Sequence, residues 1–175
     1  MRFRESLIAS SRNHQSRVIL ALDVTGPQRT RPERASKMLR ELAGRVAGVK
    51  VNFQLLLPRG VEGIAEVAAI CRENSLPLIA DIKLNDIEAT NRDAVELLFG
   101  NGVDAVIANP FVGLEEGLSG VIGRAHAMGK GVLLLVYMSH AGAKEGYGLK
   151  VDGAPLYLEF ARRVAEWDAD GAIVS

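Results

Sequence analysis

The sequence has little of what several classes of protein require. A single cysteine, Cys71, cannot form an intrachain disulfide and cannot build a zinc site alone. Aromatic residues make up only 5% of the 175 residues. Lys plus Arg and Asp plus Glu both count 21, so the formal net charge is zero. No basic stripe of the kind that binds nucleic acid is visible in the sequence, and we expect no nucleic-acid partner.

Long apolar runs are also missing. The longest uncharged apolar stretch, around 131–138, is far shorter than the roughly 20 residues of a membrane-spanning helix. Arg2, Arg4 and Glu5 interrupt the start of the chain, where a secretory leader has an apolar segment. With 48% apolar and 24% charged residues, the composition is that of an ordinary globular domain. We expect a cytoplasmic protein that does not bind a membrane.

Short apolar, β-branched runs alternate with longer helical patterns along the chain. The predicted strands are nearly continuous in apolar character, as is typical of strands covered on both faces: 18–22, 48–53, 77–83, 104–109, 132–138 and 171–174. Helical spacing of apolar residues predicts helices around 3–11, 32–42, 64–71, 94–98, 114–128 and 155–167. This alternation predicts an α/β fold built on a parallel sheet.

The predicted strand ends recur about every 27 to 31 residues, which fits two architectures. One is a (β/α)8 TIM-type barrel, which takes eight such units. On that interpretation residues 1–175 form a single (β/α) barrel domain that is truncated after about six strands, with the C-terminal strands seven and eight missing. The other is a complete six-stranded doubly wound sheet. The pattern alone does not separate them.

Polar residues gather at the carboxyl ends of the predicted strands, where both architectures place their functional sites. Asp81 and Lys83 are two residues apart, so they share one face of a strand. Lys50 ends the preceding strand and reaches the same patch if strand order follows the sequence. With Asp86 these residues would form a neutral array of two lysines and two aspartates, which suits proton transfer. A surface salt bridge at a strand end is the competing explanation, and the spacing alone does not exclude it.

The remaining histidines and aspartates do not predict a metal site. His14, His126 and His140 are not spaced as ligands on one element, and we expect His14 and His126 on the surface or in loops. Asp168 and Asp170 follow the last predicted helix, where we expect them to be exposed. We therefore predict no bound metal.

Four groups of residues carry a resemblance to a known family. They are Leu22-Asp23, Val49-Lys50-Val51-Asn52, Ala80-Asp81-Ile82-Lys83-Leu84-Asn85-Asp86-Ile87 with Thr90-Asn91, and Met138-Ser139-His140 with Gly142. In this order and at this spacing they resemble the orotidine 5′-phosphate decarboxylases, over residues 18–175. The resemblance implies an eight-stranded (β/α) barrel that works as a homodimer without metal or cofactor. It also implies conversion of orotidine monophosphate to UMP and carbon dioxide, a step of pyrimidine nucleotide synthesis.

The resemblance implies a role for each matching residue. Lys83 is similar to the proton donor to C6 of the pyrimidine, and Asp81 to the carboxylate beside the substrate carboxylate. Lys50 resembles the lysine that orients this array and touches the ribose. Asp23 is similar to a ligand of a ribose hydroxyl, and Ser139 to a contact of the pyrimidine ring.

The resemblance also implies that two subunits share each site. Asp86 is similar to the aspartate given to the partner subunit's site, with Ile87 and Thr90 crossing beside it. Ala141 stands where the family usually has proline after the Ser-His pair. The family's phosphate-binding residues belong to strands seven and eight, so no residue of this chain is assigned to phosphate.

Two other functions stay open. Magnesium-dependent enzymes similar to 3-keto-L-gulonate 6-phosphate decarboxylase share the Asp-x-Lys-x-x-Asp segment. They carry an acidic residue where this chain has Lys50, and a lysine there argues against a bound cation. The other alternative is an inactive barrel fragment, since the chain stops within a strand pattern.

Overall fold

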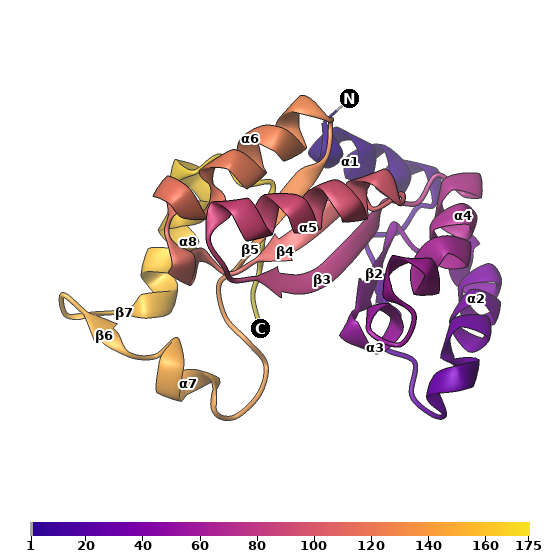
Figure 1. The fold of residues 1–175 in the computed structure, drawn as a ribbon, viewed down its shortest axis with the longest axis horizontal. Coiled ribbons are helices and arrows are strands. Elements are labelled where there is room, and N and C mark those ends of the chain that lie inside the picture. The colour runs from indigo at the N-terminus through magenta and orange to yellow at the C-terminus, as the bar shows by residue number, and fades with distance from the viewer. Residues whose placement is uncertain (1) are drawn as a thin grey trace.

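The computed structural model describes residues 2–175 and consists of one curved parallel sheet flanked by helices (Figure 1). The strand order is β1-β2-β3-β4-β5-β8, and every neighbouring pair is parallel. The strands are β1 (Ile19–Ala21), β2 (Gly48–Asn52), β3 (Leu78–Leu84), β4 (Ala105–Ala108), β5 (Gly131–Leu135) and β8 (Gly171–Ile173). In a (β/α) barrel the strands follow one another in the order of the sequence, whereas in a doubly wound sheet the strand order reverses at one point of the sheet. The barrel-type fold class is confirmed, and the doubly wound alternative is wrong.

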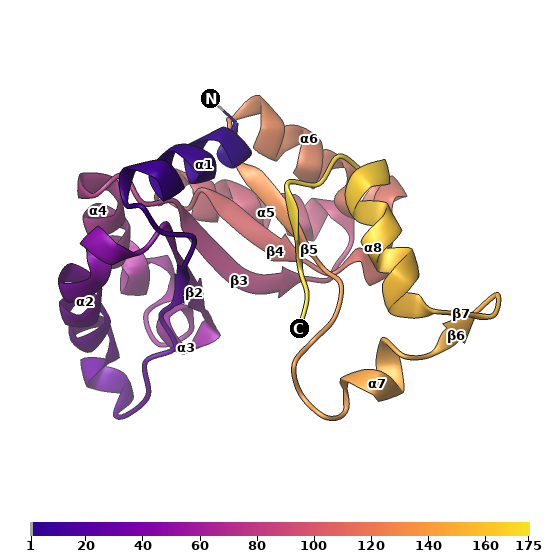
Figure 2. The same ribbon diagram turned by 180° about the vertical axis from the view of Figure 1, so that it is seen from behind.

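Apart from the start of α6, the longer helices lie where the apolar spacing predicts them, and α3 and α7 are short additions. The helices are α1 (Phe3–Asn13), α2 (Arg31–Leu42), α3 (Phe53–Leu56), α4 (Ala65–Glu73), α5 (Glu88–Gly100), α6 (Ser119–Ala127), α7 (Ala143–Gly146) and α8 (Leu156–Glu166). Figures 1 and 2 show α2, α4, α5, α6 and α8 around the outer side of the sheet, with α1 across one end. No helix among residues 2–175 is long and apolar enough to cross a membrane.

The predicted helix over 114–128 is partly wrong. Residues Leu114–Leu118 are irregular, because Glu115 (ψ 128°) and Glu116 (φ 53°) have non-helical backbone angles, and α6 begins only at Ser119. Glycines lie before and within this segment, and glycine disfavours a continuous helix. The resulting turn lies against the start of α5.

A short hairpin also lies outside the predicted elements. β6 (Lys150–Val151) and β7 (Ala154–Pro155) are antiparallel, and the two residues between them, Asp152 and Gly153, have φ values of 50° and 84°. Two positive φ values are typical of a type I′ turn, for which Asp-Gly is a strong sequence signal. The hairpin was therefore detectable in the sequence.

The core has two parts because successive strand residues point to opposite sides of the sheet. The larger part fills the space between the sheet and the outer helices. The smaller part lies on the inner side and contains Phe3, Ile79, Ala105, Ile107, Leu133 and Leu135. Phe3, on α1, is 1% exposed and packs against Gly131, where a Cβ would lie 2.6 Å from the Phe3 ring. Glycine at position 131 therefore lets α1 cover the amino end of the inner core.

Candidate active site

Two lysines and one aspartate meet at the carboxyl ends of β2 and β3. Lys50 Nζ donates a hydrogen bond to Asp81 Oδ2 at 2.9 Å, and Lys83 Nζ donates one to Asp81 Oδ1 at 2.8 Å. The Asp81 side chain is 10% exposed, whereas those of Lys50 and Lys83 are 22% and 33% exposed. The structure thus brings these three predicted residues together as one lysine–aspartate cluster, whose lysines are open to solvent.

The register of the sheet places the cluster on its inner side. Asn52 of β2 is opposite Asp81 of β3, and Lys50 is opposite Ile79. Residues opposite each other point to the same side of a sheet, and Ile79 belongs to the inner core. Lys50 and Asp81 therefore lie above that core, at the carboxyl end of the inner side.

Lys83 reaches Asp81 through an irregularity in β3. The pairing of β3 with β4 shifts between Ala80 and Leu84, and Lys83 has a φ of 47°. A left-handed backbone costs a non-glycine residue about 1–3 kcal/mol, and such strain persists where the surrounding structure enforces it. Bulges beside functional sites redirect side chains. The predicted two-residue alternation is therefore interrupted at Lys83, although its ammonium group still meets Asp81.

The electrostatics of the cluster keep Asp81 ionised. Burial by itself would raise the pKa of Asp81, but the hydrogen bonds and charges of Lys50 and Lys83 outweigh it. The pKa of Asp81 is therefore held below its ordinary value of 3.8. One carboxylate and two ammonium groups leave a net positive charge facing the inner side. Such an array can stabilise a developing negative charge and deliver a proton to it.

A second polar pair lies beside the cluster. Asn52 Nδ2 donates a hydrogen bond to Asp23 Oδ1 at 2.5 Å, while Asn52 Oδ1 accepts one from Gln54 N at 2.9 Å. Asn52 is therefore the N-cap of α3 and also orients the Asp23 carboxylate. Asn52 was not among the predicted site residues. Its N-cap position at a polar strand end is the signal that could have found it.

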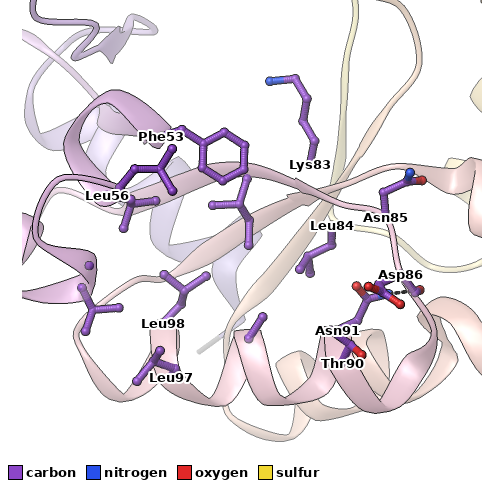
Figure 3. Close-up of a pocket in the computed structure, with 15 residues that line it drawn as sticks. Phe53, Leu56, Lys83, Leu84, Asn85, Asp86, Thr90, Asn91, Leu97 and Leu98 are labelled. Atoms are coloured by element: carbon purple, nitrogen blue, oxygen red, sulfur yellow. Dashed lines mark hydrogen bonds between the residues drawn. The ribbon is translucent and has the colours of Figure 1, made fainter.

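Asp86, Ile87 and Thr90 lie apart from the lysine–aspartate cluster. Figure 3 shows Lys83 pointing away from Asp86, which lies with Thr90 and Asn91 at the start of α5. Asp86 Oδ1 accepts a hydrogen bond from Ile87 N at 2.7 Å, and Ile87 is 66% exposed. The chain turns into α5 once β3 ends, so the Asp86 carboxylate leaves the inner side. Within one chain the expected array of four charged groups therefore has three members.

Ser139 is exposed in the loop that follows β5. The loop is attached to the barrel by aromatic contacts, because the Tyr137 ring lies 5.8 Å from that of Tyr147 and 5.3 Å from that of Tyr157. Burial raises the pKa of Tyr147. All three tyrosines of the chain thus gather beside this loop. Residues so far apart in the sequence gave no local signal of this cluster.

Acidic residues do not form a metal-binding group in the described part of the chain. No three His, Cys, Asp or Glu side chains among residues 2–175 lie together in a way that could hold a metal ion. The expectation that Asp170 is exposed is wrong, because its side chain is fully buried. Asp170 Oδ2 accepts a hydrogen bond from Val132 N at 3.0 Å and lies 3.1 Å from His126 Nε2. The reason is the packing of β8 on β5, which the sequence pattern does not reveal.

One protein-family model matches nearly the whole chain. Residues 16–175 match the model of the orotidine 5′-phosphate decarboxylase / HUMPS family. The orotidine 5′-phosphate decarboxylase of Aeropyrum pernix is 38% identical over 151 residues, which are 86% of this chain and 59% of that protein. The protein of that name from Thermococcus kodakarensis is 37% identical over 131 residues, 75% of this chain and 55% of that protein. The chain thus spans somewhat more than half the length of these relatives.

Solved structures agree with the fold. The orotidine 5′-monophosphate decarboxylase of Methanocaldococcus jannaschii superposes with a TM-score of 0.75 at 28% identity, over 90% of this chain and 69% of that chain. The orotidine 5′-phosphate decarboxylase of Pyrococcus horikoshii gives a TM-score of 0.68 at 32% identity, over 88% of this chain and 64% of that chain. The six sequential strands therefore match the corresponding part of these structures.

Proposed function

This chain belongs to the orotidine 5′-phosphate decarboxylase / HUMPS family, and we propose that it carries the catalytic cluster of a carboxy-lyase that converts orotidine monophosphate to UMP. The observation that supports this most directly is the lysine–aspartate cluster, in which Asp81 is held between Lys50 and Lys83 at 2.9 and 2.8 Å. Relatives of this name cover most of the chain at 35–38% identity. The role of each residue below belongs to this proposal.

The cluster suits a decarboxylation that uses protein groups only. The substrate carboxylate on C6 lies beside Asp81, whose negative charge repels it. The bond between C6 and the carboxyl carbon breaks, carbon dioxide leaves, and the electron pair stays on C6. The Lys83 ammonium stabilises this negative charge and then transfers a proton to C6, which yields UMP. Lys50 keeps Asp81 ionised and in position through the 2.9 Å hydrogen bond.

Neighbouring polar groups bind the rest of the nucleoside. Lys50 and Asp23 contact the ribose hydroxyls, and Asn52 holds the Asp23 carboxylate through the 2.5 Å hydrogen bond. Ser139 contacts the pyrimidine ring from the loop after β5. These groups come from two strand ends and one loop, which is how barrel enzymes usually build a site.

We also propose that the protein is a cytoplasmic homodimer in which Asp86, Ile87 and Thr90 complete the partner subunit's site. Ile87 is 66% exposed although it is apolar, and Asp86 does not face the cluster of its own chain. A groove of about 460 Å³ runs beside this turn, between α3 and α5, and the exposed apolar side chains of Phe53, Leu57 and Leu97 line it. Exposed apolar patches of this kind mark protein–protein contacts. A second copy of this chain is the partner that the shared site requires.

The magnesium-dependent alternative is less well supported. Its cation would have to lie beside Asp81, where the Lys50 ammonium already takes one carboxylate oxygen at 2.9 Å. A magnesium ion there would be repelled by the ammonium charges of Lys50 and Lys83. The lysine–aspartate cluster therefore favours chemistry in which Lys83 is the electrophilic group.

The test is direct. Purified protein is mixed with orotidine monophosphate, and the release of carbon dioxide and formation of UMP are followed with and without magnesium. We expect turnover without magnesium and none in Lys83→Ala, while UMP binding by calorimetry stays measurable in both. Turnover that depends on magnesium would favour the alternative. UMP binding without turnover would favour the inactive fragment, and a protein that does neither contradicts the proposal.

A further inference from the structure

The starts of α5 and α6 are joined by side chains that the proposed mechanism does not use. Asn91, one turn into α5, is 1% exposed. Its Nδ2 donates a hydrogen bond to Asp86 O at 2.5 Å (Figure 3). The same Nδ2 donates another to Gly117 O at 3.3 Å. One buried amide therefore connects the turn that carries Asp86 with the irregular turn before α6.

Glu88 makes a second connection one helical turn earlier. Its Oε2 accepts hydrogen bonds from Ser119 Oγ and Gly120 N, both at 2.9 Å. A Cβ at position 120 would collide with the Glu88 carboxylate, so the glycine makes this approach possible. Hydrogen bonds from Gly120 and Ser119 lower the pKa of Glu88, which keeps it ionised at the positive end of α6. Residues three apart lie on one helix face, so Glu88 and Asn91 reach α6 together.

Only the Glu88 connection acts as a helix cap, because its carboxylate accepts the backbone N–H of Gly120 near the start of α6. In the described part of the chain, neither α5 nor α6 has a side-chain hydrogen bond from its own N-cap residue, which is Ile87 for α5 and Leu118 for α6. A helix start without such a cap leaves backbone N–H groups free and the preceding turn poorly restrained. Here the restraint comes from the neighbouring helix. Asp86 and Ile87 are exposed, yet the backbone that carries them is held from the buried side.

We propose that Asn91, supported by Glu88, is a positioning residue that holds the Asp86–Ile87 turn in the orientation needed to reach the nucleotide in the partner subunit's site. This inference rests on the proposed function of Asp86. Asn91 itself is buried and does not touch the substrate. It acts only through the carbonyl of Asp86, so its effect on the site should disappear when the Asp86 carboxylate is absent.

The experiment is a double-mutant cycle on UMP affinity, measured by calorimetry with Asp86→Ala, Asn91→Ala and the double variant. We expect Asn91→Ala to weaken UMP binding about tenfold, since small displacements of a binding group are costly. In the Asp86→Ala background the same change should have almost no further effect, because interacting residues are not additive. Decarboxylation by Asn91→Ala should fall by at least the same factor.

Two substitutions on α5 serve as matched controls. Asn101 Nδ2 donates a hydrogen bond to Leu97 O at 2.8 Å at the opposite end of the helix. Asn101→Ala therefore removes a side-chain amide hydrogen bond of the same kind, but far from the turn. Val95 is fully buried, so Val95→Ala lowers stability without touching the turn. Both should bind UMP like the unaltered protein. An equal loss of UMP affinity in Val95→Ala and Asn91→Ala at matched stability would overturn the proposal. So would a loss of affinity in the Asp86→Ala, Asn91→Ala double variant that equals the product of the two single losses.

Hydrogen exchange separates this inference from the proposed function. In Asn91→Ala the amides of residues 86–90 should exchange faster relative to the rest of α5, and in Asn101→Ala they should not. If the unaltered protein neither binds UMP nor releases carbon dioxide, the proposed function fails, and the exchange result alone then decides whether Asn91 holds the turn. Unchanged exchange at 86–90 in folded Asn91→Ala overturns the positioning role in either case.

Discussion

Aspartates occur at both ends of the sheet, and two at the amino end bind the backbone of a neighbouring strand. At the amino end, Asp104 accepts a hydrogen bond from Leu78 N and Asp170 accepts one from Val132 N, both at 3.0 Å. Each of these aspartates stands just before one strand and binds the backbone at the start of the strand beside it. At the carboxyl end, the only donors to Asp81 within residues 2–175 are the lysine side chains of the cluster.

This difference separates stability from function. The Asp104 and Asp170 carboxylates each join two strands through a backbone N–H, and Asp104 also pairs with the Lys130 ammonium at 2.7 Å. The Asp81 carboxylate, by contrast, positions two flexible lysine ammonium groups, and these can still interact with a bound substrate. Barrel enzymes use their amino end for stability and their carboxyl end for chemistry, and the two sets of aspartates follow that division. Substitutions at the two ends should therefore have opposite consequences.

The largest effect is expected for Lys83→Ala. We expect kcat/KM for orotidine monophosphate to fall by at least about 10³-fold, since Lys83 both stabilises the carbanion and donates the proton. Thermal unfolding should change little, because Lys83 is partly exposed and Lys50 still pairs with Asp81. The matched control is Lys130→Ala, because the Lys130 ammonium lies 2.7 Å from Asp104 at the amino end. Equal loss of activity in both variants would remove the contrast between the ends.

Mixing two inactive variants tests whether the carboxyl end is shared between subunits. Asp86→Ala and Lys83→Ala chains are mixed and allowed to exchange subunits. Random pairing gives half heterodimers, each with one intact site, so activity should return to about a quarter of the unaltered protein. Subunit exchange is verified by mass spectrometry of labelled chains. Exchange without recovery would place Asp86 in the site of its own chain or outside the site.

At the amino end we expect a loss of stability without a loss of chemistry. Asp170→Ala leaves the buried Val132 N–H without its partner and should lower the free energy of unfolding by about 2–4 kcal/mol. Urea denaturation measures this loss, and turnover per folded molecule should stay unchanged. Asp168→Ala is the control, since Asp168 is exposed and should cost much less. A marked loss of turnover in folded Asp170→Ala would contradict the division between the ends.

The smallest effect concerns the pH dependence of stability. The pKa of Asp81 is lowered in the folded state, so its contribution to stability is complete above its ordinary value of 3.8 and is lost as the pH falls through the folded pKa. Asp81→Asn cannot titrate, so its unfolding free energy should fall less steeply with acid in that range. Urea denaturation at several pH values below about 5 measures the slope. Identical slopes for both proteins would show that Asp81 is not stabilised as an ion.

Much of the fold was predictable because its signals are local. Nearly continuous apolar runs predicted all six strands of the large sheet within a few residues, and helical spacing predicted the larger helices. The misses have specific causes. The Asp152-Gly153 turn signal was present but not used, and the segment before α6 lost its helical conformation at Glu115 and Glu116.

The candidate site was predicted less evenly. Residue types and their order along the chain were enough to single out Lys50, Asp81 and Lys83 and to predict that they meet. The role of Asn52 in holding Asp23 was missed, whereas the family resemblance had implied that Asp86 points away from its own chain's site. Each depends on how a strand ends and a helix begins, which spacing describes only roughly.

Local periodicity carries information about which side of an element is apolar, and it was sufficient for the strands, the helices and the polar edge of the sheet. It carries none about which distant segments become neighbours. Four features depend on which distant segments become neighbours. They are the strand order, the irregularity that redirects Lys83, the burial of Asp170 beside Val132 and the hydrogen bond from Asn91 to Gly117. Each joins elements that are far apart in the chain or depends on how neighbouring strands pair. Only packing in three dimensions determines whether the polar groups of these residues are satisfied.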